Sequence, residues 1–319
     1  MRVVSLAEGL PLPVARPPAA AGYLSRAYAD SLAAFGDVIA LPRSGGFLLR
    51  RPVADTAWFD ATSCYPLFCC SDWAGIAADL DEWQDRLVSA VVVTDPFDDA
   101  LLPAIRGAFG FTRHYKDHFV VETGADPATF VRRSHRDQAR RALRRVDVEV
   151  CADPLAHLDE WVRLFDVLAH RHGIAGLRRF SRSAFERQLA VPGLVMFRAI
   201  AADRTVGLDL WYVQGDTAQG HLAAFDETGY ALRASYATKW EVLRHFSDKV
   251  RFINLGAGRA ADGSDGLSEF KRGFANRQRS SWLCGRIFDQ PAYEALRARL
   301  QPAARGSDYF PIYRSVDRS

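Results

Sequence analysis

The spacing of apolar side chains along this chain predicts strands that alternate with helices. An uninterrupted apolar run over 88–94 is typical of a buried strand. Apolar runs on both sides of Ser44-Gly45 predict a hairpin. The other elements expected before residue 125 are helices over 23–35, 72–87 and 100–109, and strands over 38–41, 46–50 and 118–122.

The second part of the chain shows the same mixture more clearly. Three apolar runs predict an antiparallel meander, with Asp203-Arg204 as its first tight turn. A further apolar run, a glycine-rich turn and a short helix that begins at Asp265 follow it. The elements expected here are helices over 127–146, 154–172, 181–189 and 231–246, and strands over 147–151, 195–202, 206–213, 218–224, 250–255, 281–288 and 309–313.

Length and composition narrow the class of protein. A chain of 319 residues is long enough for two domains, and the order of elements suggests a duplication with its boundary between 125 and 150. No apolar run approaches the roughly 20 residues that cross a bilayer, so we expect no membrane span. Residues 1–22 contain several prolines and no signal peptide, which predicts an irregular lead-in and a cytoplasmic protein.

The cysteines and the missing motifs exclude several classes of function. Five cysteines without metal-ligand spacing predict buried thiols, and no metal site. The chain has no G-x-x-x-x-G-K-[ST], G-x-S-x-G or H-E-x-x-H motif and no Rossmann glycine pattern. A nucleotide hydrolase, a serine hydrolase, a zinc protease and a dinucleotide oxidoreductase are therefore disfavoured.

Lysine is rare in this protein, which makes its positions informative. Of 41 basic residues only Lys116, Lys239, Lys249 and Lys271 are lysines, and a compact ammonium does different work from a planar guanidinium. Lys271 lies on the predicted short helix, beside the end of a sheet, where α/β folds often hold ligands. A solvated lysine on an amphipathic turn is the alternative.

The helix predicted over 127–146 is strongly basic. Arg132, Arg136, Arg140 and Arg144 are four residues apart and share one face, and three more arginines flank them. So many like charges favour an anionic partner such as RNA phosphate or a diphosphate. Without interleaved aromatic residues, the contact would be to the nucleic-acid backbone. A solvated surface helix is the alternative.

Two smaller clusters also carry candidate chemistry. Asp95 follows a predicted buried strand, and Lys116 and His118 point to one face near the next strand. These three residues predict an anion pocket or an acid–base pair, with a surface ion pair as the alternative. Asp209 lies inside an apolar strand, where a carboxylate is often a site residue, and His221 on the next strand is expected to approach it. A strand face open to solvent is the alternative.

Residues 125–290 resemble the Fem family of aminoacyl-tRNA-dependent transferases, which are built on GNAT (N-acetyltransferase) domains. The most specific match is Gly266-Leu267 followed by Phe270-Lys271-Arg272-Gly273-Phe274; the looser matches are 134–143, 207–210 and 230–246. Residues 60–122 look like a first GNAT-like half. The resemblance implies an α+β fold of two GNAT-like domains, over 23–145 and 146–319, each a mixed, largely antiparallel sheet flanked by helices, with a cleft between them.

The resemblance also implies a reaction. Aminoacyl-tRNA would be the donor, the amine of a small molecule or peptide (a natural product or cell-wall precursor) the acceptor, and no cofactor would be needed. We expect a monomer. Lys271 matches the family lysine that supports transfer, and Asp209 or Glu241 would accept a proton. The expected substrate-binding residues are Phe270, packed beneath Lys271, with Lys116, His118, Asp95, Tyr212 and Arg178; the expected tRNA-binding residues are Arg132, Arg136, Arg140 and Arg144.

Two other functions stay open at this point. An acyl-CoA-dependent GNAT N-acyltransferase would use an R/Q-x-x-G-x-G/A turn to bind pyrophosphate. The matching junction, 228–236, lacks that glycine pair, and Arg233 and Tyr236 would crowd a diphosphate. The other alternative is a non-catalytic GNAT-like module that binds RNA or a carrier protein. The absence of a heptad arm disfavours a peptidoglycan-bridge enzyme and favours a small amine or peptide, as in antibiotic-tailoring relatives.

Overall fold

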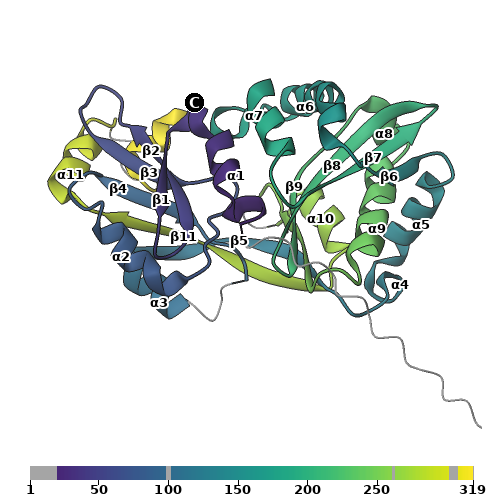
Figure 1. Cartoon of the computed structure of the whole chain (residues 1–319), viewed down its shortest axis with the longest axis horizontal. Helices are drawn as coiled ribbons and strands as arrows, with labels where there is room; N and C mark the ends of the chain where they lie inside the picture. The colour runs from purple at the N-terminus through teal and green to yellow at the C-terminus, as the bar shows by residue number, and fades with distance from the viewer. Residues whose placement is uncertain (1–19, 98–101, 261–262, 302–307, 319) are drawn as a thin grey trace, which may run out of the picture.

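One mixed sheet of eleven strands organises the fold (Figure 1). The computed structural model describes residues 20–97, 102–260, 263–301 and 308–318. Across the sheet the order is β1-β2-β3-β4-β11-β5-β10-β9-β8-β7-β6, and among these strands only β3–β4 and β9–β10 pair in parallel. The strands are β1 (Asp37–Leu41), β2 (Gly46–Pro52), β3 (Phe59–Ser63), β4 (Ser89–Val93), β5 (Phe111–Glu122), β6 (Asp147–Val150), β7 (Leu194–Ala201), β8 (Arg204–Gln214), β9 (Thr217–Phe225), β10 (Phe252–Ala257) and β11 (Arg277–Ile287). The predicted α+β class with a largely antiparallel sheet is confirmed.

From a three-stranded meander onward, the two halves of the sheet have the same order of elements, and they exchange their last strands. In each half a three-stranded meander leads through helix to a parallel strand, β4 beside β3 and β10 beside β9. The next strand then crosses over: β5 pairs with β10, β11 pairs with β4, and the two crossing strands pair with each other. Figure 1 shows β5 and β11 running between the two lobes. Neither half completes its part of the sheet alone.

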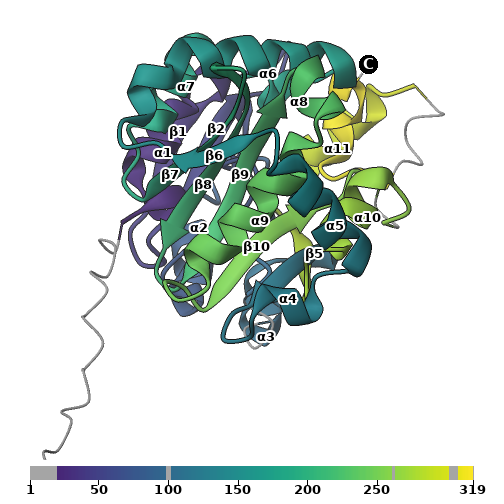
Figure 2. The ribbon, with the colours of Figure 1, turned by 90° about the vertical axis from the view of Figure 1, so that its right-hand side faces the viewer.

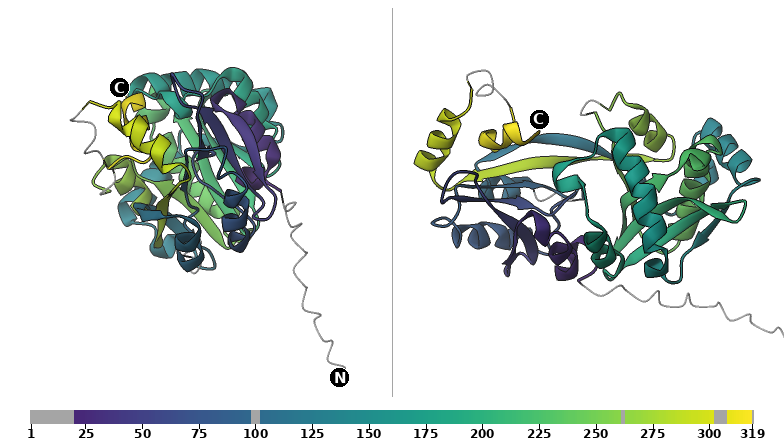
Figure 3. Two further views of the ribbon diagram at one scale, coloured as in Figure 1. Left: turned by 90° about the vertical axis from the view of Figure 1, so that its left-hand side faces the viewer. Right: turned by 90° about the horizontal axis from the view of Figure 1, so that it is seen from above.

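The C-terminal helix lies with the first half of the molecule. Tyr293 and Leu296 on α11 (Gln290–Ala298) share an apolar cluster with Val53 and Val88. Figure 3 shows α11 beside the lobe that contains β1 to β4. The predicted division at 145/146 falls between α5 (Arg133–Ala142) and β6 and stays a prediction, since β11 and α11 pack against the other side of it.

Helices cover both faces of the second half (Figure 2). The face with Leu208, Leu210 and Tyr212 packs against α1 (Arg26–Ser31), α6 (Leu158–His172) and α7 (Arg182–Leu189). The face with Trp211 packs against α9 (Ala234–Phe246), and α5 lies on α9. The remaining α-helices are α2 (Ile76–Asp81), α3 (Leu102–Ala108), α4 (Pro127–Phe130), α8 (Glu227–Ala231) and α10 (Gly266–Arg272).

Polar side chains cap the N-termini of two helices at the positions that the sequence predicts. Ser181 Oγ accepts a hydrogen bond from Ala184 N at the start of α7. The carboxylate of Asp265 accepts from the backbone N–H groups of Leu267 and Ser268 at the start of α10. These caps satisfy N–H groups that have no partner inside the helix. The predicted starts of both helices are confirmed.

Several predicted helices are interrupted. The helix expected over 127–146 breaks at Val131, whose extended backbone separates α4 from α5, and ends at Ala142. The helix expected over 231–246 is split by Arg233, which has a φ of 58°. Turns of 3-10 helix also replace parts of the other expected helices: η1 (Gly22–Leu24), η2 (Ala33–Phe35), η3 (Trp73–Gly75) and η5 (Pro154–His157). The start of the helix expected at 100 and most of the lead-in over 1–22 lie outside the described residues.

The predicted strands agree with the structure better than the predicted helices do, with three exceptions. The strand expected over 118–122 begins at Phe111, so it includes Lys116. The edge strand expected over 309–313 is wrong. Ile312 begins the 3-10 helix η8 (Ile312–Arg318), because this apolar segment buries itself against α11 rather than against a strand. The sequence reading missed β3, whose Asp60 is buried and held by Arg51 and by Arg314 at 3.1 and 2.8 Å.

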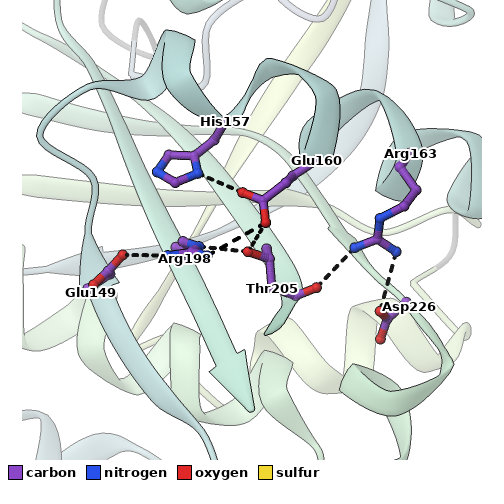
Figure 4. Close-up of polar contacts among 7 residues, drawn as sticks. All are labelled: Glu149, His157, Glu160, Arg163, Arg198, Thr205 and Asp226. Atoms are coloured by element: carbon purple, nitrogen blue, oxygen red, sulfur yellow. Dashed lines mark hydrogen bonds and ion pairs between the residues drawn. The ribbon is translucent and has the colours of Figure 1, made fainter. Parts of the chain in front are cut away.

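A polar network fastens α6 to the edge of the sheet (Figure 4). Arg198 on β7 donates to Thr205 Oγ1 at 2.6 Å and pairs with Glu149 on β6 at 3.2 Å. Thr205 donates in turn to Glu160 on α6, which accepts from His157 Nδ1 at 2.6 Å. The network joins the edge strand β6, the next two strands β7 and β8, and the helix α6, and it includes none of the predicted site residues.

Candidate functional site

The parallel strands β9 and β10 part inside the sheet and form a fork. Their pairing runs only from Phe252–Thr217 to Asn254–Gln219, whereas both strands continue beyond these pairs. The register between β10 and β5 also shifts after Asn254. The fork therefore opens beside the strand end that precedes the predicted lysine-bearing helix.

Lys271 and Lys116 bind consecutive carbonyl groups at the end of β10. Lys271 Nζ, from α10, donates to Ala257 O at 2.7 Å. Lys116 Nζ, from β5, donates to the carbonyl oxygens of the next two residues at 3.0 and 2.8 Å. Gly256 lies beneath: its φ of 80° suits glycine, and a side chain there would meet Lys271 Nζ at 3.0 Å. The end of β10 thus holds two ammonium groups.

Lys239 on α9 adds a third ammonium, whose positive charge acts on Lys271. Its Nζ donates to Asp209 Oδ2 at 2.9 Å and lies 4.4 Å from the centroid of the Trp211 ring. Lys239 and Asp209 are both buried. The fourth lysine, Lys249, is exposed beside His245. We call Lys116, Lys239 and Lys271 the lysine cluster; it contains three of the four lysines of an arginine-rich chain.

The surroundings of Lys271 make its ammonium group easy to deprotonate. Its pKa is lowered to about 7, first by burial, which disfavours the charged form, and then by the positive charge of Lys239. The carboxylates of Asp209 and Asp265 act in the opposite direction, and Lys116 lowers the pKa a little further. At neutral pH Lys271 is therefore present in both the charged and the neutral form.

Asp209 reaches the lysine cluster, but His221 does not reach Asp209. Asp209 lies on β8 opposite Ala223, and its Oδ1 makes no hydrogen bond to a described residue. His221 is the extra residue of a bulge on β9, which turns its ring to the other face, where Nδ1 contacts Tyr23 Oη at 3.0 Å. The expected approach across the hairpin is wrong. Burial lowers the pKa of His221 to about 3, so this histidine is neutral.

The other predicted cluster is joined through two amide side chains that sequence reasoning missed. His118 Nδ1 contacts Asn254 Oδ1 at 3.2 Å, and Asn254 Nδ2 donates to Gln219 Oε1 at 2.7 Å. Gln219 Nε2 donates in turn to Asp95 Oδ2 at 2.9 Å. Burial lowers the pKa of His118 to about 4. His118 and Asp95 thus belong to one buried polar chain across the sheet, without direct contact between them.

The pattern Phe-Lys-x-Gly-Phe holds α10 in place. The Phe270 ring packs edge-on against Tyr236 of α9 at 4.9 Å and lies 5.2 Å from Phe274. His135 of α5, which sequence reasoning missed, donates from Nε2 to Phe270 O at 3.1 Å. Any side chain at Gly273 would overlap the His135 ring. The motif therefore anchors the helix on α5 and α9 and directs Lys271 toward β10.

Two predicted substrate-binding residues lie elsewhere. Tyr212 is fully buried on the face opposite Asp209, and its hydroxyl donates to Gln188 O at 2.9 Å. Arg178 is exposed at the end of η6 (Gly176–Arg178), beyond the C-terminal end of α6. Glu241, the other candidate base, pairs with Arg244 at 3.2 Å. The structure does not bring any of these three into contact with the lysine cluster.

The four predicted tRNA-binding arginines differ in whether they have partners within the protein. Arg132 and Arg140 pair with the carboxylates of Glu269 and Asp137 at 3.1 and 3.2 Å. Arg136 donates to a backbone carbonyl of α4. Arg144 is exposed beyond the end of α5 and makes no hydrogen bond or ion pair to a described residue. Arg144 is therefore the most available of the four for an external anion.

Two hollows in the described surface contain no member of the lysine cluster. One, of about 330 Å³, is lined by Arg145, Arg204 and Thr228; the other, of about 390 Å³, lies beside Arg244 and Pro127. Among the described residues, no three His, Cys, Asp or Glu side chains gather as metal ligands would. None of the described helices combines the length and apolar character that a membrane crossing requires.

The segment that carries most of this site matches a known family. Residues 129–272 match the family model described as an acetyltransferase (GNAT) domain. The matched segment includes α5, α9, α10 and the fork between β9 and β10, but not β5 or β11. No curated protein matches the chain in a sequence comparison.

Solved structures share the fold of nearly the whole chain. FemX matches with a TM-score of 0.65 at 12% identity, over 89% of this chain and 95% of that one. The C-terminal domain of a protein described as a lysylphosphatidylglycerol synthetase from Agrobacterium fabrum matches with 0.58 at 15% identity, over 85% and 90%. L-PGS from Bacillus licheniformis matches with 0.53 at 14% identity, over 88% and 98%. The predicted resemblance to Fem-like transferases of the GNAT superfamily is confirmed in the fold.

Proposed function

We propose that this protein is an aminoacyltransferase that forms an amide bond between the aminoacyl group of an aminoacyl-tRNA and an amine. The observation that carries the proposal is the lysine cluster at the fork of β9 and β10. The fold shared with FemX and the GNAT-type domain over 129–272 support acyl transfer as the class of reaction. The resemblance to the Fem family supports aminoacyl-tRNA as the donor.

The reaction needs a positive charge where Lys271 stands. The amine nitrogen attacks the ester carbonyl carbon, an oxyanion forms, and the ribose oxygen leaves with the bonding electrons. A positioned ammonium stabilises either oxygen, and the gain is large where water is excluded. Lys271 is half-buried and close to the end of β10, and Phe270 beneath it fixes the direction of α10.

Asp209 is the proposed acceptor of the proton that the attacking amine loses. Its Oδ2 is held by Lys239, whereas its Oδ1 has no hydrogen bond to a described residue. The proton balance then closes within the site, because the amine loses one proton to Asp209 and the leaving ribose oxygen gains one from Lys271.

The acceptor amine would enter from the side of β5. His118 and Asp95 belong to the buried polar chain, and Lys116 on β5 binds carbonyl groups at the end of β10. Arg178 lies on η6, after α6. The acceptor we propose is the amine of a small molecule or peptide, such as a natural-product or cell-wall precursor. Tyr212 would act only indirectly, by shaping the buried face behind β8.

The basic helix is the proposed contact surface for tRNA. Arg132, Arg136, Arg140 and Arg144 would bind backbone phosphates, with Arg144 free to do so without losing an internal partner. This donor places the protein in the cytoplasm. We expect it to act as a monomer and to need no cofactor.

An acyl-CoA-dependent N-acyltransferase is the second candidate, and the description of the matching domain favours it. Two residues are expected to crowd a diphosphate. Of these, Tyr236 packs against Phe270, whereas Arg233 is exposed. The experiment below separates the two donors.

The deciding experiment mixes the purified protein with total tRNA charged with radiolabelled amino acids, and runs acetyl-CoA in a parallel tube. We expect one aminoacyl-tRNA to be protected or discharged, which would also name the amino acid. Binding of CoA with no effect on any charged tRNA would contradict the proposal and favour the acyl-CoA reaction.

A further inference from the structure

Lys239 has contacts that a merely structural lysine does not need. Its ammonium is buried between the Asp209 carboxylate, at 2.9 Å, and the face of Trp211, at 4.4 Å. Burying an ion pair costs much desolvation, and apolar residues of similar size often stabilise a core at least as well. Lys239 is also one of only four lysines in a chain that otherwise uses arginine. Its presence there calls for a reason beyond packing.

We propose that Lys239 is a positioning residue for the transfer, which acts on Lys271 and Asp209 and not on the substrate. It fixes Oδ2 of Asp209 by a hydrogen bond and leaves Oδ1 to take the proton. Its positive charge also acts on Lys271. This inference rests on the proposed function for its role in transfer, but its electrostatic part can be measured without a donor.

Charged groups other than Lys239 also act on the pKa of Lys271. Asp209 on β8 and Asp265 at the start of α10 attract the proton of Lys271, whereas Lys116 and Lys239 repel it. His118 on β5 is kept neutral at pH 7 by burial. Among these groups only Lys239 touches Asp209. Its removal takes away a repulsion and frees a carboxylate, and both changes hold the proton on Lys271 more tightly.

The first test follows the titration of Lys271 directly. Trace acetylation with acetic anhydride from pH 5 to 11, read by mass spectrometry, resolves all four lysines of the chain. In the wild type Lys271 should react with a midpoint of about pH 7. In Lys239→Met the midpoint should rise by about one pH unit or more. Lys249→Met is the matched control and should leave the midpoint of Lys271 unchanged, since Lys249 is exposed beside His245.

The second test follows the pH dependence of kcat/KM for transfer. The charged form of Lys271 stabilises the oxyanion, so the rate falls as pH rises through its pKa. In Lys239→Met this alkaline limb should move to higher pH, whereas Lys239→Arg should restore the wild-type limb. A role in packing alone would lower the rate and leave the limb in place. If Lys239→Met fails to fold, Lys239→Gln is the second variant, because its neutral amide can still donate a hydrogen bond to Asp209.

The outcomes separate the inference from the proposed function. An unchanged midpoint of Lys271 in every folded variant at position 239 overturns the inference. The inference is also overturned if the Lys271 midpoint rises but the alkaline limb of the kcat/KM profile stays in place, because Lys239 would then not influence transfer. If the midpoint rises in the variants but the wild-type protein uses no charged tRNA, the proposed function is overturned and only the electrostatic part of the inference is supported.

Discussion

At the scale of single residues, the position of Lys271 argues for a functional role at some cost in stability. Its burial lowers its pKa from the ordinary 10.5 to about 7, so the folded protein binds this proton more weakly than the unfolded chain does. The contribution of Lys271 to the free energy of unfolding therefore rises as pH increases from about 7 towards 10.5. Below pH 7 the partly desolvated ammonium destabilises the fold.

The replacement Lys271→Ala should separate the role of Lys271 in transfer from its effect on stability. Loss of the cation should reduce kcat at least about a hundredfold, the size typical of losing one oxyanion donor. The midpoint of urea unfolding should fall little or not at all, because a partly desolvated charge is removed. Lys249→Ala, measured alongside, should change neither quantity. A collapse of stability in Lys271→Ala would instead assign the residue to packing.

At the scale of elements, the close packing of α5, α9 and α10 decides where Lys271 points. Gly273→Ala would drive a side chain into the His135 ring, and we expect a loss of about 1–3 kcal/mol in the free energy of unfolding. Gly266→Ala on the same helix is the matched control, since a side chain there meets no atom within 4 Å. Equal stability of the two variants would contradict the packing argument. His135→Ala in the Gly273→Ala background should recover part of the loss.

The ion pairs of α5 predict which arginines contact tRNA. Arg141→Ala with Arg144→Ala removes two exposed guanidinium groups that have no partner among the described residues. The slope of log Kd against log salt for charged tRNA should fall by about 1.5, or roughly 0.7–0.9 for each lost phosphate contact. Arg132→Ala with Arg140→Ala should reduce the slope less, because both arginines already pair with carboxylates. Identical slopes in the wild type and both variants would remove RNA from this face.

At the scale of the whole molecule, the exchange of β5 and β11 makes the two halves depend on each other. A fragment over 123–319 keeps the complete matched domain but lacks β5, the strand between β10 and β11. The edge of β10 that pairs with β5 and both edges of β11 would be exposed, and with the core uncovered the fragment should be unfolded or aggregated. Circular dichroism and gel filtration against the full chain measure this outcome. A folded, monomeric fragment would contradict the mutual dependence of the halves.

The local chemistry of the chain is enough to predict much of the fold. Apolar spacing identifies most strands, because alternation and burial are local signals, and Ser181 and Asp265 begin helices through bonds to their own neighbours. The rarity of lysine pointed to Lys271, and the same count could have singled out Lys239. The α+β class and the resemblance to Fem-like transferases also come from the sequence.

The tertiary structure alone decides which side chains meet. Asn254 and Gln219 join His118 to Asp95 through strand pairings that no spacing encodes, and a one-residue bulge turns His221 away from Asp209. A bulge reverses the faces of a strand without a clear mark in the sequence. The pairing of Lys239 with Asp209 likewise depends on how α9 lies on the sheet. The sequence thus determines the elements and the rare residues, while long-range packing determines the site that they form.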